Sequence, residues 1–266
     1  MNKISNFRHN KLVCIDSDGC VFDSMESKHR NCFGPQILNI WKLGVAENQV
    51  TEKWNQVNLY SETRGINRFK GLALVLKAFG EEDEEIIHQW TLRADTLSNQ
   101  TLSLESDPAL KRALLWSEAV NDAISRMPLP QPFDCVKESI VRISEQADIV
   151  VVSSTNPAAL MEEWSAAGFV QYVSAIMSQH DGPKSQCIMT LIQKGYTPEN
   201  IIMLGDAPGD YRASVDNDIQ FFPICPRYEK ESWKEFLKSI FPMFLSGKYH
   251  FSGEQEYCRM FLEMFT

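Results

Sequence analysis

The sequence predicts an α/β fold, in which a doubly wound parallel sheet is interrupted after its first strand by an all-helical insertion. Short apolar runs alternate with helical patterns from residue 133 onwards, as expected for parallel strands joined by helices. A similar apolar run stands alone at residues 12–15, and residues 24–127 carry helical spacing without a convincing strand pattern. We therefore expect residues 1–23 and 128–266 to form the sheet domain, and residues 24–127 to form a separate helical domain.

The first strand is predicted at residues 12–15, where Leu-Val-Cys-Ile precedes Asp-Ser-Asp-Gly. Consecutive apolar residues are typical of a strand that is buried on both faces. Gly19 allows a sharp turn after the strand, because glycine adopts backbone conformations that other residues avoid. Asp16 and Asp18 are therefore expected at the carboxyl end of a buried strand.

The helical insertion carries several start and stop signals. Residues 35–44 begin with proline and end with glycine, and residues 69–79 have helical apolar spacing. Residues 81–97 begin with an acidic run, which suits a helix N-terminus. A further helix opens at residues 107–108, and the proline-rich segment 127–132 marks a domain boundary.

The remaining segments alternate between strands and helices. Apolar and β-branched runs predict parallel strands at residues 148–153, 172–177, 201–205 and 219–222. Helical patterns predict helices at residues 133–146, 156–168, 184–194, 208–217, 233–240 and 254–265. Because the residue before a proline disfavours the helical conformation, the helix at residues 233–240 is expected to end before Pro242.

Composition narrows the classes of protein to which this chain could belong. The 266 residues carry a formal net charge of -9, whereas a nucleic-acid binder would usually present a basic face. The 7 cysteines are widely spaced without a Cys-x-x-Cys pair, which argues against a disulfide framework and a zinc site. No apolar run approaches the roughly 20 residues of a membrane span. We expect a cytoplasmic protein that binds neither nucleic acid nor a membrane; its oligomeric state stays open.

Polar side chains follow four of the predicted strands at the point where each strand ends. They are Asp16 and Asp18 after the first strand, Ser153 and Ser154 after the second, Lys184 beyond the third, and Asp206 and Asp210 after the fourth. Ligand sites in open parallel sheets lie at the carboxyl ends of the strands. The sequence therefore predicts a single site formed by these residues.

Asp16 and Asp18 lie two residues apart, so on an extended chain both carboxylates point the same way and can address one substrate. One carboxylate can attack phosphorus and form an aspartyl-phosphate. The other can protonate the leaving oxygen and later take a proton from water. The same Asp-x-Asp-Gly pattern also occurs in strand-end turns with two solvated carboxylates, so the pair by itself does not establish catalysis.

The other strand-end residues suit the binding of magnesium and phosphate. Asp206 and Asp210 offer hard oxygen ligands of the kind that Mg²⁺ prefers, although an aspartate here could also cap the next helix. Ser153 can donate to a phosphate oxygen, while it and Ser154 also suit a helix cap. Lys184 lies at a predicted helix N-terminus, where the macrodipole disfavours a cation. That position indicates a bound anion, with an exposed lysine as the ordinary alternative.

Taken together, these segments resemble the motifs of the haloacid dehalogenase-like (HAD) hydrolase superfamily. The first motif reads Ile-Asp-Ser-Asp-Gly-Cys-Val-Phe-Asp at residues 15–23, and the second reads Ile-Val-Val-Val-Ser at residues 149–153. Lys184 would be the third motif, and Leu-Gly-Asp-Ala-Pro-Gly-Asp at residues 204–210 the fourth. The order of the four motifs and their strand context match the family.

The resemblance implies a Rossmann-like catalytic core, formed by residues 1–23 and 128–266, with a helical cap at residues 24–127. It implies that Asp16 is the nucleophile and a magnesium ligand. Asp18 would be the general acid and base, with its main-chain carbonyl on the metal.

The resemblance also implies roles for the later motifs. Ser153, Ser154 and Lys184 would hold the phosphoryl group. Asp206 would bind Mg²⁺ directly, and Asp210 would support the metal site.

An acid at position 18 favours a leaving group that needs a proton, which halide does not. The resemblance therefore implies a magnesium-dependent phosphatase that hydrolyses a small phosphorylated metabolite, with a sugar phosphate as the preferred class. In the cap, Arg64 and Arg68 flank a glycine and an asparagine and could recognise an anionic or polyhydroxyl leaving group. A solvated loop is the alternative for this stretch.

Two other functions stay open. A phosphoglucomutase-like phosphotransferase would use the same aspartate pair, pass through a bisphosphate and release little free phosphate. A non-catalytic phosphate-ligand-binding protein would be expected to lack Asp16 or Asp18, and both are present.

Overall fold

The computed structural model describes residues 7–250 and 256–266 of the chain. Within this part the chain forms two compact units. An α/β unit contains the residues up to Ser24 together with residues 129–264 and 266, and a helical unit contains residues 25–128 and 265. Each unit has a hydrophobic core of its own.

The α/β unit is built on a parallel sheet with strand order β3-β2-β1-β4-β5. Strands β2 and β3 lie on one side of β1, and strands β4 and β5 lie on the other. This order confirms the predicted doubly wound sheet. The strands are β1 (Leu12–Ile15), β2 (Asp148–Val152), β3 (Ala175–Met177), β4 (Ile201–Gly205) and β5 (Gln220–Pro223).

Strand β1 lies at the centre of the sheet between β2 and β4, and all of its residues are buried. The register pairs Ile15 with Val151 on one side and with Leu204 on the other. The backbone N–H of Asp16 donates to the carbonyl of Leu204 at 3.0 Å. Asp16 therefore stands at the carboxyl edge of the sheet, directly beside the end of β4.

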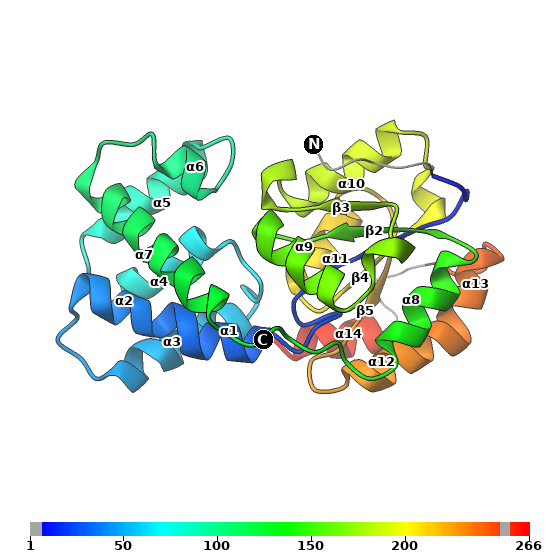
Figure 1. Cartoon of the computed structure of the whole chain (residues 1–266), viewed down its shortest axis with the longest axis horizontal. Helices are drawn as coiled ribbons and strands as arrows, with labels where there is room; N and C mark the ends of the chain where they lie inside the picture. The colour runs from blue at the N-terminus through cyan, green and yellow to red at the C-terminus, as the bar shows by residue number, and fades with distance from the viewer. Residues whose placement is uncertain (1–6, 251–255) are drawn as a thin grey trace. The chain divides into compact units, whose positions relative to one another are not determined.

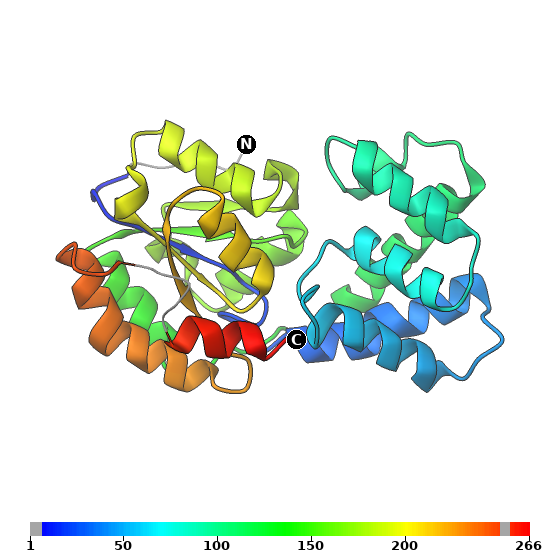
Figure 2. The same cartoon turned by 180° about the vertical axis from the view of Figure 1, so that it is seen from behind.

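Helices cover both faces of this sheet, with α8 and α9 on one face and α10 and α11 on the other (Figures 1 and 2). Asn156 caps α9 by accepting from the N–H of Ala158 at 2.9 Å, as the Asn-Pro signal predicts. The helices of the unit are α8 (Val136–Ser144), α9 (Pro157–Ala166), α10 (Lys184–Gln193), α11 (Pro208–Val215), α12 (Glu229–Glu235), α13 (Phe241–Leu245) and α14 (Glu256–Glu263).

Alternate strand residues supply the core on one face of the sheet. Val13 and Ile15 belong to the same buried cluster as Ile140 of α8, Trp164 of α9 and Trp233 of α12. Because successive strand residues point to opposite faces, this alternation also leaves Leu12 and Cys14 to the opposite face. The two buried faces hold β1, and with it the turn that follows, in a fixed place.

The predicted helix end before Pro242 is wrong. A π-helical segment, Phe236–Ile240, continues directly into α13, Phe241–Leu245. Pro242 is the second residue of α13, so its missing N–H removes one hydrogen bond from the continued helix. The aromatic side chains of Phe236, Phe241 and Phe244 are buried in the core, which favours continuation of the helix.

The helical unit contains no strand in its described residues, as the sequence predicts. A cluster of stacked and edge-on aromatic rings forms its centre, including Phe33, Trp54, Phe69 and Trp116. Its helices are α1 (Met25–Lys28), α2 (Gly34–Trp41), α3 (Glu47–Leu59), α4 (Arg68–Ala78), α5 (Asp83–Arg93), α6 (Asn99–Leu102) and α7 (Pro108–Ser125).

None of the helices in residues 7–250 and 256–266 has both the length and the apolar character that a bilayer crossing requires.

Candidate active site

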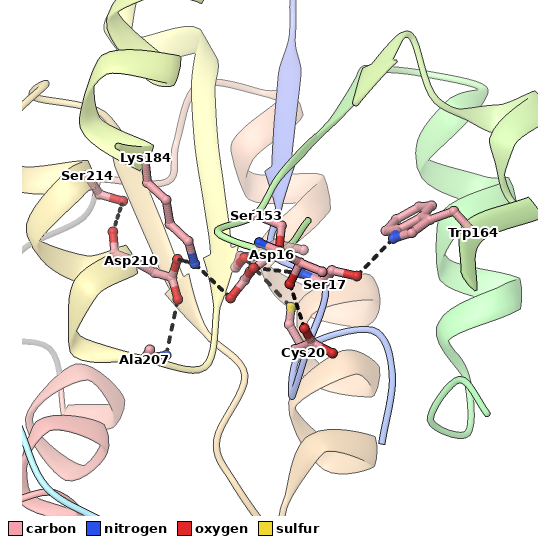
Figure 3. A network of polar contacts seen from close by, with 12 residues as sticks. Asp16, Ser17, Cys20, Ser153, Trp164, Lys184, Ala207, Asp210 and Ser214 are labelled. Carbon is pink, nitrogen blue, oxygen red and sulfur yellow. Dashed lines mark hydrogen bonds and ion pairs between the residues drawn. The ribbon is translucent and has the colours of Figure 1, made fainter. Parts of the chain in front are cut away.

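The carboxyl edge of the sheet brings together side chains from three separate segments. Asp16 follows β1, Asp206 follows β4, and Asp210 lies in the first turn of α11. Lys184 is the first residue of α10, and its side chain points toward Asp16 and Asp210 (Figure 3). These four predicted residues therefore meet at one place.

The carboxylate of Asp16 is buried and held by two contacts. Its Oδ1 accepts from the N–H of Ser17 at 2.7 Å, and its Oδ2 lies 2.7 Å from Nζ of Lys184. Burial raises the pKa of Asp16 to about 6; Lys184 opposes this rise and Asp206 adds to it. The ion pair with Lys184 favours the ionised form of this carboxylate.

Lys184 lies between two carboxylates. Its Nζ is 2.7 Å from Oδ2 of Asp16 and 2.5 Å from Oδ1 of Asp210. Burial by itself would lower the pKa of Lys184, but the two carboxylates outweigh burial and raise it. Lys184 therefore carries a permanent positive charge beside Asp16.

Asp210 is fully buried, and burial raises its pKa to about 6 despite the nearby ammonium of Lys184. Its Oδ2 accepts from the N–H of Ala207 at 3.1 Å, which ties the carboxylate to the start of α11. Gly205 makes room for this arrangement, because a Cβ at that position would lie 2.2 Å from Cγ of Asp210. The close approach of the Asp210 side chain therefore explains why the residue before Asp206 is a glycine.

The donor set fits a divalent cation. Asp16, Asp206 and Asp210 are all buried, and one ligand oxygen from each lies within 4.8 Å of the others. Carboxylate oxygens are the ligands that Mg²⁺ prefers. The three carboxylates and the ammonium of Lys184 leave two negative charges, which one Mg²⁺ ion would balance.

Asp18 lies outside this three-carboxylate cluster and is half-buried. Its Oδ1 accepts from Oγ of Ser24, and its Oδ2 accepts from Oγ1 of Thr155 at 2.7 Å. Gly19, with a φ of 76°, turns the chain immediately afterwards. Thr155 is a site residue that the sequence prediction missed, although the run of hydroxyl residues at 153–155 was a signal for it.

The two serines after β2 differ in their surroundings. Ser153 is buried, and its Oγ accepts from the N–H of Thr155 at 3.3 Å. A hydroxyl that accepts one hydrogen bond still has its own proton to donate, so Ser153 keeps the capacity to bind a phosphate oxygen. Ser154 is exposed, and its predicted contact with phosphate stays a prediction.

The loop between Asp16 and Asp18 is anchored by Trp164 of α9. The indole Nε1–H of Trp164 donates to Oγ of Ser17 at 2.9 Å, and both residues are fully buried (Figure 3). Cys20 lies beneath the same loop, with its Sγ 3.7 Å from the carbonyl oxygen of Leu204. These contacts fix the backbone that carries the two aspartates.

The two arginines predicted to bind substrate make contacts inside the helical unit. Arg64 is buried, and its Nη1 donates to the carbonyl of Leu59 at 3.0 Å. Nη1 of Arg68 donates to Oδ1 of Asn121 at 2.7 Å and to Oγ of Ser117 at 3.2 Å. These contacts give both arginines a role in packing the helical unit, and their role in substrate recognition stays a prediction.

No family model and no curated relative matches the sequence. Solved structures do match the fold. A protein from Bacteroides fragilis assigned as a haloacid dehalogenase-like hydrolase has a TM-score of 0.56 at 10% identity, over 80% of this chain and 86% of that chain. A predicted phosphoglycolate phosphatase from Haemophilus somnus has a TM-score of 0.55 at 14% identity, over 79% of this chain and 83% of that chain.

A further structure, assigned as a phosphoglycolate phosphatase from Lactobacillus delbrueckii subsp. bulgaricus, has a TM-score of 0.54 at 12% identity, over 81% of this chain and 86% of that chain. At such low identities the likeness concerns the fold, which spans both the parallel sheet and the helical insertion. The chain therefore has the fold of the haloacid dehalogenase-like hydrolases.

Proposed function

We propose that this protein is a magnesium-dependent phosphatase, which hydrolyses a small phosphorylated metabolite through an aspartyl-phosphate. The observation that carries the proposal is the buried group at the carboxyl edge of the sheet. There Asp16 lies 2.7 Å from Lys184 and within 4.8 Å of ligand oxygens of Asp206 and Asp210. An anionic nucleophile, a permanent cation and a cation-binding carboxylate cluster together suit attack on a phosphate ester.

In the first step, a carboxylate oxygen of Asp16 attacks phosphorus while the bond from phosphorus to the ester oxygen breaks. Asp18, as the carboxylic acid, gives its proton to the departing oxygen, so that an alcohol leaves. Lys184 and the hydroxyl of Ser153 stabilise the charge that develops on the phosphoryl oxygens. The products of this step are the alcohol and an aspartyl-phosphate on Asp16.

In the second step, Asp18 is a carboxylate and takes a proton from water, whose oxygen attacks phosphorus. The bond from phosphorus to Asp16 breaks, which releases inorganic phosphate and restores the Asp16 carboxylate. Asp18 has then regained its proton, so both aspartates are ready for another cycle.

Asp16, Asp206 and Asp210 would hold the Mg²⁺ ion, together with the main-chain carbonyl of Asp18. When bound, Mg²⁺ neutralises the phosphate and allows the anionic Asp16 to approach it. The negative charge of Asp16 adds to the rise in the pKa of Asp210, whereas Lys184 lowers the pKa of both carboxylates, as do the N–H groups of Ser17 for Asp16 and Ala207 for Asp210.

Two features support a phosphate ester as the substrate. Asp18 supplies the proton that an alcohol leaving group requires and a halide does not. Two of the structures with the same fold are assigned as phosphoglycolate phosphatases, which favours a small phosphorylated acid or sugar phosphate. We also propose that the helical unit, expected at residues 24–127, is a cap that selects the substrate.

The proposal is tested by measuring phosphate release from a panel of sugar phosphates, phosphorylated acids and p-nitrophenyl phosphate. We expect release from at least one compound with Mg²⁺, and loss of release when EDTA removes the metal. Phosphoryl transfer between sugar hydroxyls with little free phosphate would instead indicate a mutase. Failure of every compound in the presence of Mg²⁺ would rule out the phosphatase.

The covalent mechanism is tested by Asp16→Asn, which preserves the shape of the side chain and removes its nucleophilic oxygen. We expect turnover to fall by at least about 10⁴-fold, because an amide cannot replace the attacking carboxylate. Circular dichroism should show an unchanged fold, since the buried core around β1 is not altered. Retention of most of the wild-type rate would contradict an aspartyl-phosphate on Asp16.

A further inference from the structure

Asp18 makes a contact that crosses from the loop after β1 to the loop after β2. Oγ1 of Thr155 donates to Oδ2 of Asp18 at 2.7 Å, while Oγ of Ser24 donates to Oδ1. Each carboxylate oxygen therefore accepts from a different hydroxyl. Two such contacts define the direction of the carboxyl group as well as its position.

Thr155 is itself fixed at its backbone. Its N–H donates to Oγ of Ser153 at 3.3 Å, and its carbonyl accepts from the N–H of Gln179 at 3.2 Å. Gln179 lies in the turn after β3. Thr155 thus connects the loops that follow the neighbouring strands β1, β2 and β3. Because its backbone is held in this way, its hydroxyl can hold Asp18 in a defined place.

We propose that Thr155 is a positioning residue, which holds Asp18 in the orientation from which it protonates the leaving oxygen. This inference rests on the proposed phosphatase function. A hydroxyl is both a donor and an acceptor, so Thr155 can hold Asp18 as a carboxylate and as a carboxylic acid. Holding the acid in place is valuable because a displacement of about 1 Å can cost roughly 10²-fold in rate.

A positioning role predicts an effect that depends on the leaving group. The p-nitrophenolate ion is stable and departs without a proton, whereas an alkoxide must be protonated as it leaves. A misplaced Asp18 therefore slows the cleavage of alkyl phosphates and spares p-nitrophenyl phosphate. General damage to the site would slow both substrates equally.

The test measures kcat/KM for p-nitrophenyl phosphate, phenyl phosphate and glycerol 2-phosphate, because this constant reports the step in which the alcohol leaves. Thr155→Val keeps the shape of the side chain and removes the hydroxyl. We expect it to lower kcat/KM about 10–100-fold for glycerol 2-phosphate, and less than about threefold for p-nitrophenyl phosphate. Thr155→Ser retains the hydroxyl and should restore most of the loss.

Two comparisons separate positioning from packing. Thr197→Val makes the same change at an exposed residue before β4, and it should match the wild type on all three esters. Asp18→Asn should show the same dependence on the leaving group, and adding Thr155→Val to it should cause no further loss. If Thr155→Val fails to fold, Ser24→Ala removes the other hydroxyl and should give the same pattern.

The possible failures are distinguishable. A wild-type protein without activity on any ester would overturn the proposed function and this inference together. A wild-type protein that responds to Asp18→Asn as expected, but loses activity equally on all esters with Thr155→Val, would overturn this inference alone. A loss that adds in full to that of Asp18→Asn would do the same.

Discussion

Lys184 organises the charges at the residue scale. Its ammonium lies between Asp16 and Asp210, both of which are buried and have their pKa raised to about 6 by burial. Buried carboxylates are costly unless they are paired, so each of these aspartates depends on Lys184 or on a bound cation. The pairing therefore links the proposed nucleophile, Asp16, to the proposed metal site through one side chain.

Gly205 should be intolerant of even the smallest side chain. In Gly205→Ala the new Cβ would lie 2.2 Å from Cγ of Asp210, so the carboxylate must move. We expect the variant to lose about tenfold or more in phosphatase rate and to need more Mg²⁺ for half-maximal activity, because the displaced carboxylate would no longer support the metal in the right place. A magnesium titration of activity measures both effects.

The matched control for this prediction is Gly209→Ala, four residues further along the chain. An added Cβ at Gly209 would meet no atom within 4 Å. That variant should keep a rate and a magnesium requirement close to those of the wild type. Equal effects of the two substitutions would contradict the packing role of Gly205.

At the scale of elements, the start of β2 is fixed by a single carboxylate. Asp148 is buried and accepts from the hydroxyl of Tyr196 at 2.7 Å, from the N–H groups of His9 at 2.8 Å and Arg8 at 3.0 Å, and from the hydroxyl of Ser174 at 2.9 Å. Burial tends to raise the pKa of Asp148, but these hydrogen bonds outweigh it and lower the pKa. The carboxylate thereby joins the segments that precede β1, β3 and β4.

This arrangement predicts a dependence of stability on acid. A carboxylate with a lowered pKa in the folded state stabilises the protein above its unfolded pKa of about 3.9, and this contribution is lost as the pH falls through the folded pKa. Asp148→Asn should therefore be less stable than the wild type at pH 7, by about 1–3 kcal/mol. The difference between the two proteins should shrink as the pH falls below about 4.

Urea unfolding followed by circular dichroism between pH 7 and pH 3 measures both effects. Asp216→Asn is the control, because Asp216 is exposed at the end of α11 and its substitution should change stability little at any pH. A constant gap between Asp148→Asn and the wild type across this range would show that the Asp148 carboxylate is not the titrating group.

At the scale of the whole molecule, the chain has two separate hydrophobic cores. One surrounds the sheet and the other lies among the helices of residues 25–128. Because each core is contained within its own unit, a defect in one core should weaken mainly the unit that contains it.

Leu110→Ala tests this separation. Leu110 is 1% exposed in the core of the helical unit, and its truncation should cost about 2–5 kcal/mol. Leu115→Ala makes the same change on the same helix α7, but Leu115 is 56% exposed, so this control should stay within about 0.5 kcal/mol of the wild type.

Hydrogen exchange locates the effect. In Leu110→Ala, amides of α4, α5 and α7 should exchange faster, while amides of β1, β2 and β4 keep their protection. Equal acceleration in both units would show instead that the molecule unfolds as one cooperative body.

The sequence by itself determined the order of the strands along the chain, the helical character of the insertion and the polar residues at the strand ends. These features follow from local patterns, because a buried parallel strand is apolar throughout and its carboxyl end is where polar residues first appear. Asp16 and the Asp206–Asp210 pair were found in this way. A short local pattern was misleading at Pro242, where burial of neighbouring aromatic rings favoured a continued helix.

Only the tertiary structure decided which of those residues touch. The ammonium of Lys184 bridges Asp16 and Asp210, Gly205 makes room for Asp210, and Thr155 holds Asp18. Each contact joins loops that are far apart in the sequence, and its geometry depends on the register of β1 with β2 and β4. These distances cannot be deduced from the spacing of residues along the chain, because they depend on which strands are neighbours in the sheet.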